Sequence, residues 1–307
     1  MSNYKIHIVI NPASAGGKTG ESKEKIIREL KNQIGNNFDL TVTRAKTDAT
    51  TITREAITNG CGVVVAVGGD GTVNEVANGF FDNGKIINPD VKLGIISFGT
   101  GQGFAHSIGL LADFSTQIKI IKNNKARLID VGKIHFENNN LSKYFVNEFQ
   151  LGIGGTLNKN ISRLTKKLLG KYAFGFEAVK TLMHYQANEL QMIINEKVFT
   201  EKIIGIVISN GAFTGGGMRL TPFALTNDGL LDVLLIKDMS LTDRYISFSK
   251  VYSAKHIDLE AFQLFKTKKI EFRYKNGLAV SSDGELITDK CVSAEVIPSA
   301  LKVISNN

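Results

Sequence analysis

The sequence lacks the features that mark secreted, membrane-spanning and metal-cluster proteins. It holds only two cysteines in 307 residues, Cys61 and Cys291, too few for a disulfide framework or a cysteine metal site. No apolar run approaches the ~20 residues that cross a bilayer. The strand-like residues 6–10 follow the first residues without a signal-peptide core. We therefore expect a cytoplasmic protein.

The chain also lacks a basic motif, interleaved with aromatic residues, of the kind that favours nucleic acid as a partner. The chain nevertheless has 37 Lys and Arg against 29 Asp and Glu, a formal net charge of +8. Such a balance attracts acidic partners, among them anionic lipid and phosphorylated substrates. We find no internal repeat and no low-complexity linker.

The most informative stretch is residues 68–72, which read Gly-Gly-Asp-Gly-Thr. It follows the apolar run 63–67, typical of a buried strand, and precedes 73–80, whose apolar positions recur at helical spacing. A glycine turn between strand and helix presents free N–H groups and the positive end of the helix dipole, which suits phosphate. The Asp70 carboxylate would repel a bare triphosphate, so we expect a nucleotide bound with Mg²⁺.

Two widespread phosphate motifs do not fit this turn. It lacks the Gly-Lys-Ser/Thr end of the P-loop, and Val73 and Asn74 stand where the dinucleotide fingerprint has a third glycine. The structural alternative is a glycine turn that serves packing alone.

Strand-like and helix-like segments alternate over the first 130 residues, which predicts a Rossmann-like α/β domain with a parallel sheet. The expected strands are 6–10, 40–43, 63–67 and 93–97, and the expected helices are 21–34, 50–59, 73–80 and one ending at 117–122. Ligands bind beyond the carboxyl ends of such strands. Three glycine-rich or polar segments fall there: 11–20, 68–72 and 99–103.

From about residue 130 the strand-like runs follow one another, which predicts an all-β unit, a sandwich or partly closed barrel. The runs are 126–134, 144–149, 189–194, 203–209, 230–236, 268–274 and 278–281, with helices expected at 161–186 and 242–257. The final run, 292–304, could belong to either unit.

Three further segments offer chemistry, although each could be an ordinary turn. Thr100, in the glycine-rich third loop, offers a hydroxyl to phosphate. Asp228, in an Asn-Asp-Gly turn, could hold a hard cation together with backbone carbonyls. Asp283 or Glu285 could remove a proton from an attacking hydroxyl.

Basic residues outnumber acidic ones in 159–184, and leucines and aromatics lie between them. A basic amphipathic segment suits an anionic membrane surface, and the alternative is a solvated helix face.

Together these motifs resemble the bacterial diacylglycerol-kinase-like lipid kinases, relatives of sphingosine and ceramide kinases. The ordered set spans essentially the whole chain: Asn11-Pro12, Thr43, 68–75, Gly99-Thr100, Phe104-Ala105, Asp130-x-Gly132, Asn147, 215–218, Pro222-x-Ala224, 227–232 and 283–285. The resemblance implies an α/β nucleotide-binding domain, a β-sandwich domain and a C-terminal tail that returns to the first domain. These would be residues 1–131 completed by 296–307, and residues 132–295, with ATP in the cleft between them.

The resemblance also implies roles for matching residues. Those that would bind the nucleotide are Asn11, Thr43, Gly68, Gly69, Asp70, Gly71, Thr72, Val73, Asn74 and Thr100. Glu285, with Asp283 beside it, would be the general base that takes the proton from the lipid hydroxyl. Asp70 would help to place Mg²⁺ and the phosphates. Asp228 and the carbonyl groups of Leu225 and Leu230 would hold a structural Mg²⁺.

The third loop departs from the family pattern Gly-Thr-x-Asn-Asp-Phe-Ala-Arg. Gln102 and Gly103 replace the Asn-Asp pair, and His106 stands at the arginine. The loop thus lacks a carboxylate and a fixed positive charge. Either the acceptor differs from diacylglycerol, or Mg²⁺ is arranged differently, or activity is weak.

We therefore interpret the chain as an ATP-dependent lipid kinase, peripheral to the membrane, with a homodimer left open. The acceptor could be diacylglycerol, a sphingoid-type base, phosphatidylglycerol or another lipid alcohol. One alternative is a soluble-substrate kinase such as an NAD kinase, which shares the Gly-Gly-Asp-Gly turn. The other is a non-catalytic regulator that binds nucleotide or lipid.

Overall fold

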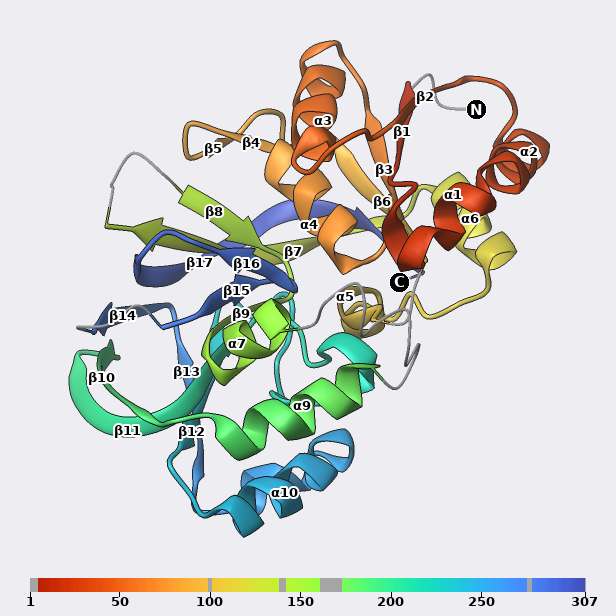
Figure 1. Ribbon diagram of the computed structural model, residues 1–307. Helices are drawn as coiled ribbons and strands as arrows, with labels where there is room; N and C mark the ends of the chain where they lie inside the picture. Colours follow the sequence, from red (N-terminus) through yellow and green to blue (C-terminus); the bar gives the residue numbers. More distant parts are fainter. Residues whose placement is uncertain (1–4, 99–100, 138–141, 161–172, 275–277, 307) are drawn as a thin grey trace.

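The computed structural model describes residues 5–98, 101–137, 142–160, 173–274 and 278–306. Figure 1 shows helices packed around a parallel sheet in the upper part of the molecule and antiparallel strands in the lower part. Within the described residues, no helix has the length and apolarity needed to cross a membrane.

The parallel sheet of the first part has the strand order β6-β3-β1-β2. α2 and α6 pack together beside it, and α3 and α4 pack together on the other side (Figure 1). Because helices cover both faces, the central strand must be apolar throughout, and every residue of β3 is buried. The strands are β1 (Ile6–Ile10), β2 (Phe38–Val42), β3 (Val63–Gly68) and β6 (Lys92–Ser97). The helices are α1 (Lys18–Glu21), α2 (Lys23–Ile34), α3 (Asp48–Thr58), α4 (Asp70–Gly79), α5 (Gly103–Ser107) and α6 (Phe114–Asn123).

The second part consists mainly of antiparallel strands that enclose a separate hydrophobic core. The strands are β7 (Ala126–Phe136), β8 (Ser142–Phe145), β9 (Glu148–Gly152), β10 (Asn188–Ile194), β11 (Lys197–Ser209), β12 (Leu231–Lys237), β13 (Phe262–Thr267), β14 (Lys269–Arg273), β15 (Val280–Ser282), β16 (Glu285–Ile287) and β17 (Cys291–Ile304). Three helices lie beside them: α7 (Ile153–Asn160), α9 (Ala173–His184) and α10 (Leu241–Lys250).

The last strand, β17, connects the two parts. Its first half pairs with β14 in the second part, and Lys302 and Val303 pair in parallel with β6 of the first sheet. Along most of its length it also pairs with β7. Leu301 and Val303 are fully buried in the first core, whereas Ala294 belongs to the second. The final run thus belongs to both units, and the boundaries at 131/132 and 295/296 stay predictions.

Several local predictions were wrong, for identifiable reasons. Residues 144–149 form two strands, because the backbone N–H groups of 146, 147 and 148 donate to the Asp283 carboxylate and leave the strand ladder. The helix expected at 242–257 ends at Lys250, and Ala254 has left-handed backbone (φ 60°). A hairpin of β4 (Phe81–Asp82) and β5 (Lys85–Ile86) was missed, although its Asn83-Gly84 turn is a strong hairpin signal. Residues 161–172 of the basic segment lie outside the described residues.

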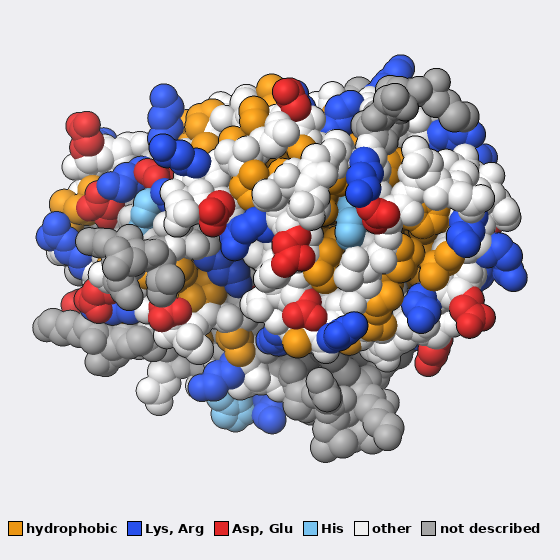
Figure 2. Space-filling view, turned by 90° about the horizontal axis from the view of Figure 1, so that it is seen from above, with side chains coloured by type: hydrophobic (Ala, Val, Ile, Leu, Met, Phe, Trp, Pro, Cys, Tyr) orange, Lys and Arg blue, Asp and Glu red, His pale blue; other side chains and the backbone are white. Residues whose placement is uncertain are grey.

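The excess positive charge is dispersed on the face seen in Figure 2. Blue Lys and Arg side chains alternate there with red Asp and Glu, and no single basic patch dominates this face. The charge of +8 therefore acts on this side as a diffuse attraction for acidic partners.

Candidate active site

The glycine turn between β3 and α4 has the strand–turn–helix geometry predicted from the sequence. α4 begins at Asp70, and Gly69 before it has extended backbone (φ −90°, ψ −174°). Only glycine fits at residue 68, because a Cβ there would overlap the side chain of Thr72. The free N–H groups of a ten-residue helix therefore face the turn, and this arrangement binds phosphate.

Asp70 joins this turn to the third loop. Its carboxylate accepts hydrogen bonds from the backbone N–H groups of Gly103 (3.2 Å) and Phe104 (3.3 Å) at the start of α5. Both bonds are longer than the typical value of about 2.9 Å, so the carboxylate retains capacity for a further ligand. Burial raises the pKa of Asp70, and the two N–H groups oppose this shift.

The other predicted nucleotide-binding residues lie at the ends of neighbouring strands. Asn11 follows β1, and its Nδ2 donates to Thr72 Oγ1 over 3.0 Å. Thr43 follows β2, and its backbone N–H donates to the carbonyl of Ile10 over 2.9 Å. The structure thus brings Asn11, Thr43 and residues 68–74 to one edge of the sheet. Thr100 lies outside the described residues.

Asp283 is a structural clamp rather than a free base. Its carboxylate accepts hydrogen bonds from Asn74 Nδ2 (2.6 Å) and from the backbone N–H groups of residues 146 (2.9 Å), 147 (3.0 Å) and 148 (2.7 Å). Burial raises the pKa of Asp283 to about 6, although these donors lower it. With its oxygens engaged in this way, Asp283 positions the turn that carries Glu285.

Glu285 lies directly opposite the glycine turn. A Cβ at Gly71 would be only 3.3 Å from Glu285 Oε1, so the carboxylate packs against this glycine. Its other oxygen lies 3.7 Å from Lys143 Nζ, and a quarter of the side chain is exposed. Burial, and then the charge of Glu285, raise the pKa of neighbouring Glu75. Unlike the Asp283 carboxylate, which four donors engage, the Glu285 carboxylate is partly exposed and pairs with Lys143 only at 3.7 Å, so it is open to a ligand.

The predicted structural Mg²⁺ site does not fit the residues present. Lys266 Nζ lies 2.7 Å from Asp228 Oδ2 and 3.2 Å from Asp232 Oδ2, so an ammonium group occupies the place of a cation. The other oxygen of Asp228 accepts the backbone N–H of Leu230 (3.1 Å). Among the described residues, no group of three or more His, Cys, Asp and Glu could hold a metal.

A cavity of about 180 Å³ lies beside the turn. Carboxyl groups line one end of it, from Asp70, Asp283 and Glu148, a residue that the sequence did not single out. The remainder is mainly apolar and is lined by residues from β9, α7, β11, α10, β13 and the segment after β11, among them Leu151, Ile153, Ile206, Leu220, Phe248 and Phe262. One end can thus hold a polar group, and the other a hydrocarbon chain.

Comparison with known families accounts for nearly all of the chain. The diacylglycerol kinase catalytic domain matches residues 5–134, and the YegS C-terminal NAD kinase beta sandwich-like domain matches residues 149–305. The chain belongs to the diacylglycerol-kinase-like lipid kinases. It is therefore a phosphotransferase with an alcohol group as acceptor.

Individual relatives are distant but match over almost their full length. The diacylglycerol kinase of Bacillus subtilis is 25% identical over 284 residues, which covers 92% of this chain and 89% of that protein. A protein of Pseudomonas aeruginosa named "Probable lipid kinase YegS-like" is 26% identical over 303 residues, which covers 99% of this chain and 95% of that protein. A diacylglycerol kinase structure from Bacillus anthracis has a TM-score of 0.72 at 19% identity, and the match covers 100% of this chain and 98% of that chain. A second structure from that organism reaches a TM-score of 0.78 at 20% identity. These likenesses confirm the predicted fold of an α/β domain and a β-sandwich domain.

In this lipid kinase a cationic side chain lies close to the position of the arginine that the third loop lacks. His106, at the usual arginine position, stacks on Phe213 with ring centroids 3.4 Å apart. The guanidinium carbon of Arg219 lies 5.5 Å from the centroid of the same ring. Burial, and then Arg219, lower the pKa of His106. The cationic group thus comes from the segment after β11, where only the folded chain could reveal it.

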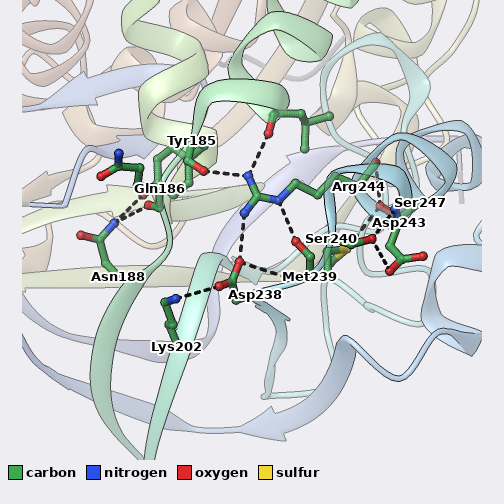
Figure 3. A network of polar contacts seen from close by, with 11 residues as sticks. Tyr185, Gln186, Asn188, Lys202, Asp238, Met239, Ser240, Asp243, Arg244 and Ser247 are labelled. Atoms are coloured by element: carbon green, nitrogen blue, oxygen red, sulfur yellow. Dashed lines mark hydrogen bonds and ion pairs between the residues drawn. The ribbon is translucent and has the colours of Figure 1, made fainter.

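A polar network fixes the helices of the kinase that border the apolar end of the cavity (Figure 3). Arg244 of α10 is buried, and its guanidinium donates to the carbonyls of Leu182 (2.9 Å) and Tyr185 (2.7 Å) at the end of α9. It also pairs with Asp238 at 2.9 Å, and Asp238 in turn pairs with Lys202 of β11 at 3.0 Å. α9, α10 and β11 are therefore held together by one buried cation.

Proposed function

We propose that this lipid kinase transfers the γ-phosphate of Mg-ATP to a hydroxyl group of a lipid, diacylglycerol or a related lipid alcohol, at an anionic membrane surface. One observation carries the proposal: Glu285 packs against Gly71 of the phosphate-type turn. A candidate base and a candidate phosphate site therefore face each other. Phosphoryl transfer depends mainly on such positioning and on charge neutralisation.

Different residues of the site would bind the phosphates, hold the metal and accept the proton. The N–H groups at the start of α4 would bind the phosphates, with Asn11 and Thr43 at the adjoining strand ends. Mg²⁺, when bound, would neutralise charge on the transferred phosphoryl group, and Asp70 is the carboxylate placed to hold it. Glu285 would take the proton of the acceptor hydroxyl.

The acceptor would enter from the apolar cavity. Its hydrocarbon would lie among Ile204, Ile236 and Phe262, and its hydroxyl would lie at the carboxyl-lined end. An apolar cavity of this kind favours a lipid over NAD and therefore disfavours the soluble-substrate alternative. The retained pairing of Glu285 with the glycine turn disfavours a regulator without catalysis.

The test is transfer of labelled γ-phosphate from Mg-ATP to an extracted mixed-lipid pool in detergent micelles. Asp70→Ala should abolish the labelled lipid. Glu285→Gln should lower turnover by about 100-fold or more, as loss of a general base does, while ATP binding persists. An unlabelled lipid pool together with intact ATP binding would contradict the proposal, and transfer of the label to NAD in a parallel assay that offers NAD in place of lipid would favour the soluble-substrate kinase.

A further inference from the structure

Glu148 is a buried carboxyl at the polar end of the cavity, and the functions proposed so far do not use it. It is the first residue of β9, only 6% of its surface is exposed, and its side chain lines the cavity with Asp70 and Asp283. Burying a carboxyl group costs free energy unless it gains hydrogen-bonding partners. Because this carboxyl faces the cavity, a ligand there could supply a further partner.

The protein fixes this carboxyl from several sides. The Thr214 hydroxyl donates to Glu148 Oε2, and the side chain of Gln150 also contacts the carboxyl. The backbone of Glu148 is bonded to Asp283 in both directions, as N–H to Oδ1 (2.7 Å) and as carbonyl to the Asp283 N–H (2.8 Å). Since Glu285 follows Asp283 by two residues, Glu148 is held beside the turn that carries the candidate base.

The third loop has no carboxyl group at residue 103, and Glu148 replaces that group. A Cβ at Gly103, where the family has aspartate, would lie 2.9 Å from the carbonyl oxygen of Phe213 and 3.1 Å from Asn147 Nδ2. No side chain fits there. The same Cβ would lie 3.1 Å from the backbone carbon of Thr214, whose hydroxyl donates to Glu148 Oε2, so one residue links the Glu148 carboxyl to the position that the loop has lost.

We propose that Glu148 determines acceptor specificity by binding a second hydroxyl group, next to the one that is phosphorylated. The acceptor class is then a single-chain or headgroup lipid with two neighbouring free hydroxyls, as in a monoacylglycerol. This inference rests on the proposed function. It predicts that lipids whose only free hydroxyl is the reacting one are poor acceptors.

The charge state of Glu148 favours a hydroxyl over an amine. Burial, and then the charges of Asp283 and Asp70, raise its pKa to about 8, while Thr214 and Gln150 oppose the shift. A neutral carboxyl both donates and accepts a hydrogen bond, and so does a hydroxyl. An ammonium group would instead require the ionised form.

The test compares 1-oleoylglycerol with 1-oleoyl-1,3-propanediol, which lacks only the second hydroxyl. Wild-type kcat/KM should be roughly tenfold or more higher for the glycerol lipid, because a buried partner left unpaired is penalised. In Glu148→Met the ratio should fall to about one, and in Glu148→Gln it should persist in part, since an amide also donates and accepts.

Glu271→Met, on the exposed face of β14, is the matched control and should keep the wild-type ratio. A second readout needs no nucleotide: 1-oleoylglycerol should raise the melting temperature of the wild type more than the deoxy lipid does, and Thr214→Val should weaken this difference.

Equal use of both lipids by an active wild type would overturn the role of Glu148 and leave the kinase function intact. A preference for sphingosine would overturn the choice of a hydroxyl. Absence of transfer to every lipid would remove the proposed function itself.

Discussion

Asn74 Nδ2 donates to Asp283 Oδ2 over 2.6 Å, although 209 positions separate the two residues. Asn74 lies on α4, the helix that begins at the phosphate-type turn, and Asp283 lies in the turn before Glu285. The same Asn74 amide also donates to the carbonyl of Tyr144 over 2.9 Å. One side chain therefore sets the distance between the turn and the candidate base.

Replacing Asn74 with Ala should lower both stability and turnover. The change removes two buried hydrogen bonds and leaves the Asp283 carboxylate without one of its donors, at a cost of about 1–3 kcal/mol. Urea unfolding measures the loss, and turnover should fall more than ATP affinity. Asn32→Ala, at an exposed position of α2, should leave both unchanged. An equal loss in the two variants would contradict the role of the Asn74–Asp283 bond.

Restoring the family residue in Gly103→Asp should destabilise the protein. The new Cβ would press on the Phe213 carbonyl at 2.9 Å, and overpacking of this kind costs about 1–3 kcal/mol. By contrast, Gln102→Asn should be neutral or slightly stabilising, because residue 102 has left-handed backbone (φ 47°), which Asn tolerates well. Denaturant midpoints compare the two. A Gly103→Asp variant as stable as the wild type would refute the steric argument.

Glu148→Gln should change how stability depends on pH. Burial raises the pKa of Glu148 to about 8 from 4.5, so its contribution to stability is present below 4.5 and is lost as the pH rises through 8. Between about pH 5 and pH 8, the unfolding free energy of the variant minus that of the wild type should therefore rise by up to several kcal/mol. Above about pH 8 this difference should stay constant. Asp283 and Asp70 are present in both proteins, so their contributions cancel in this comparison. A difference that stays constant with pH would show that Glu148 is not protonated at neutral pH.

Lys266→Met should create a dependence on Mg²⁺ that the wild type does not have. Without the ammonium, Asp228 and Asp232 face each other unneutralised, which should cost about 1 kcal/mol for a partly exposed pair. Millimolar Mg²⁺ should restore part of the melting temperature of the variant, while EDTA should leave the wild type unchanged. Lys268→Met, at an exposed neighbouring position, serves as the control. A wild type destabilised by EDTA would show that Lys266 does not replace a cation.

Local patterns were sufficient to predict the parts of the site that are contiguous in the chain. The Val-Val-Val-Ala-Val run and the glycines after it determine a buried strand and a turn within a few residues of sequence, and the predicted order of strand, turn and helix is confirmed, although the helix begins at Asp70 and not at Val73. The approach of Asp283 and Glu285 to that turn followed only from the family resemblance, because no local rule brings residues 209 positions apart together.

The features that were missed depend on register between distant segments. Lys266 reaches Asp232 because β12 and β13 pair these two residues directly. Glu148 faces the cavity because Asp283 draws the backbone out of the ladder just before β9. Arg219 lies over the ring of Phe213, on which His106 of the third loop also stacks. In each case the sequence shows the type of residue but not which distant residue it contacts in the fold.

The placement of β17 has a consequence for how the chain folds during synthesis. The β6 edge of the first sheet is completed by Lys302 and Val303, which leave the ribosome more than 200 residues after β6 itself. Until then the nascent α/β unit exposes an unpaired strand edge, a template on which chains can aggregate. A ribosome stalled anywhere before residue 301 should therefore carry a nucleotide-binding half that is open to chaperones and proteases, however early its helices form.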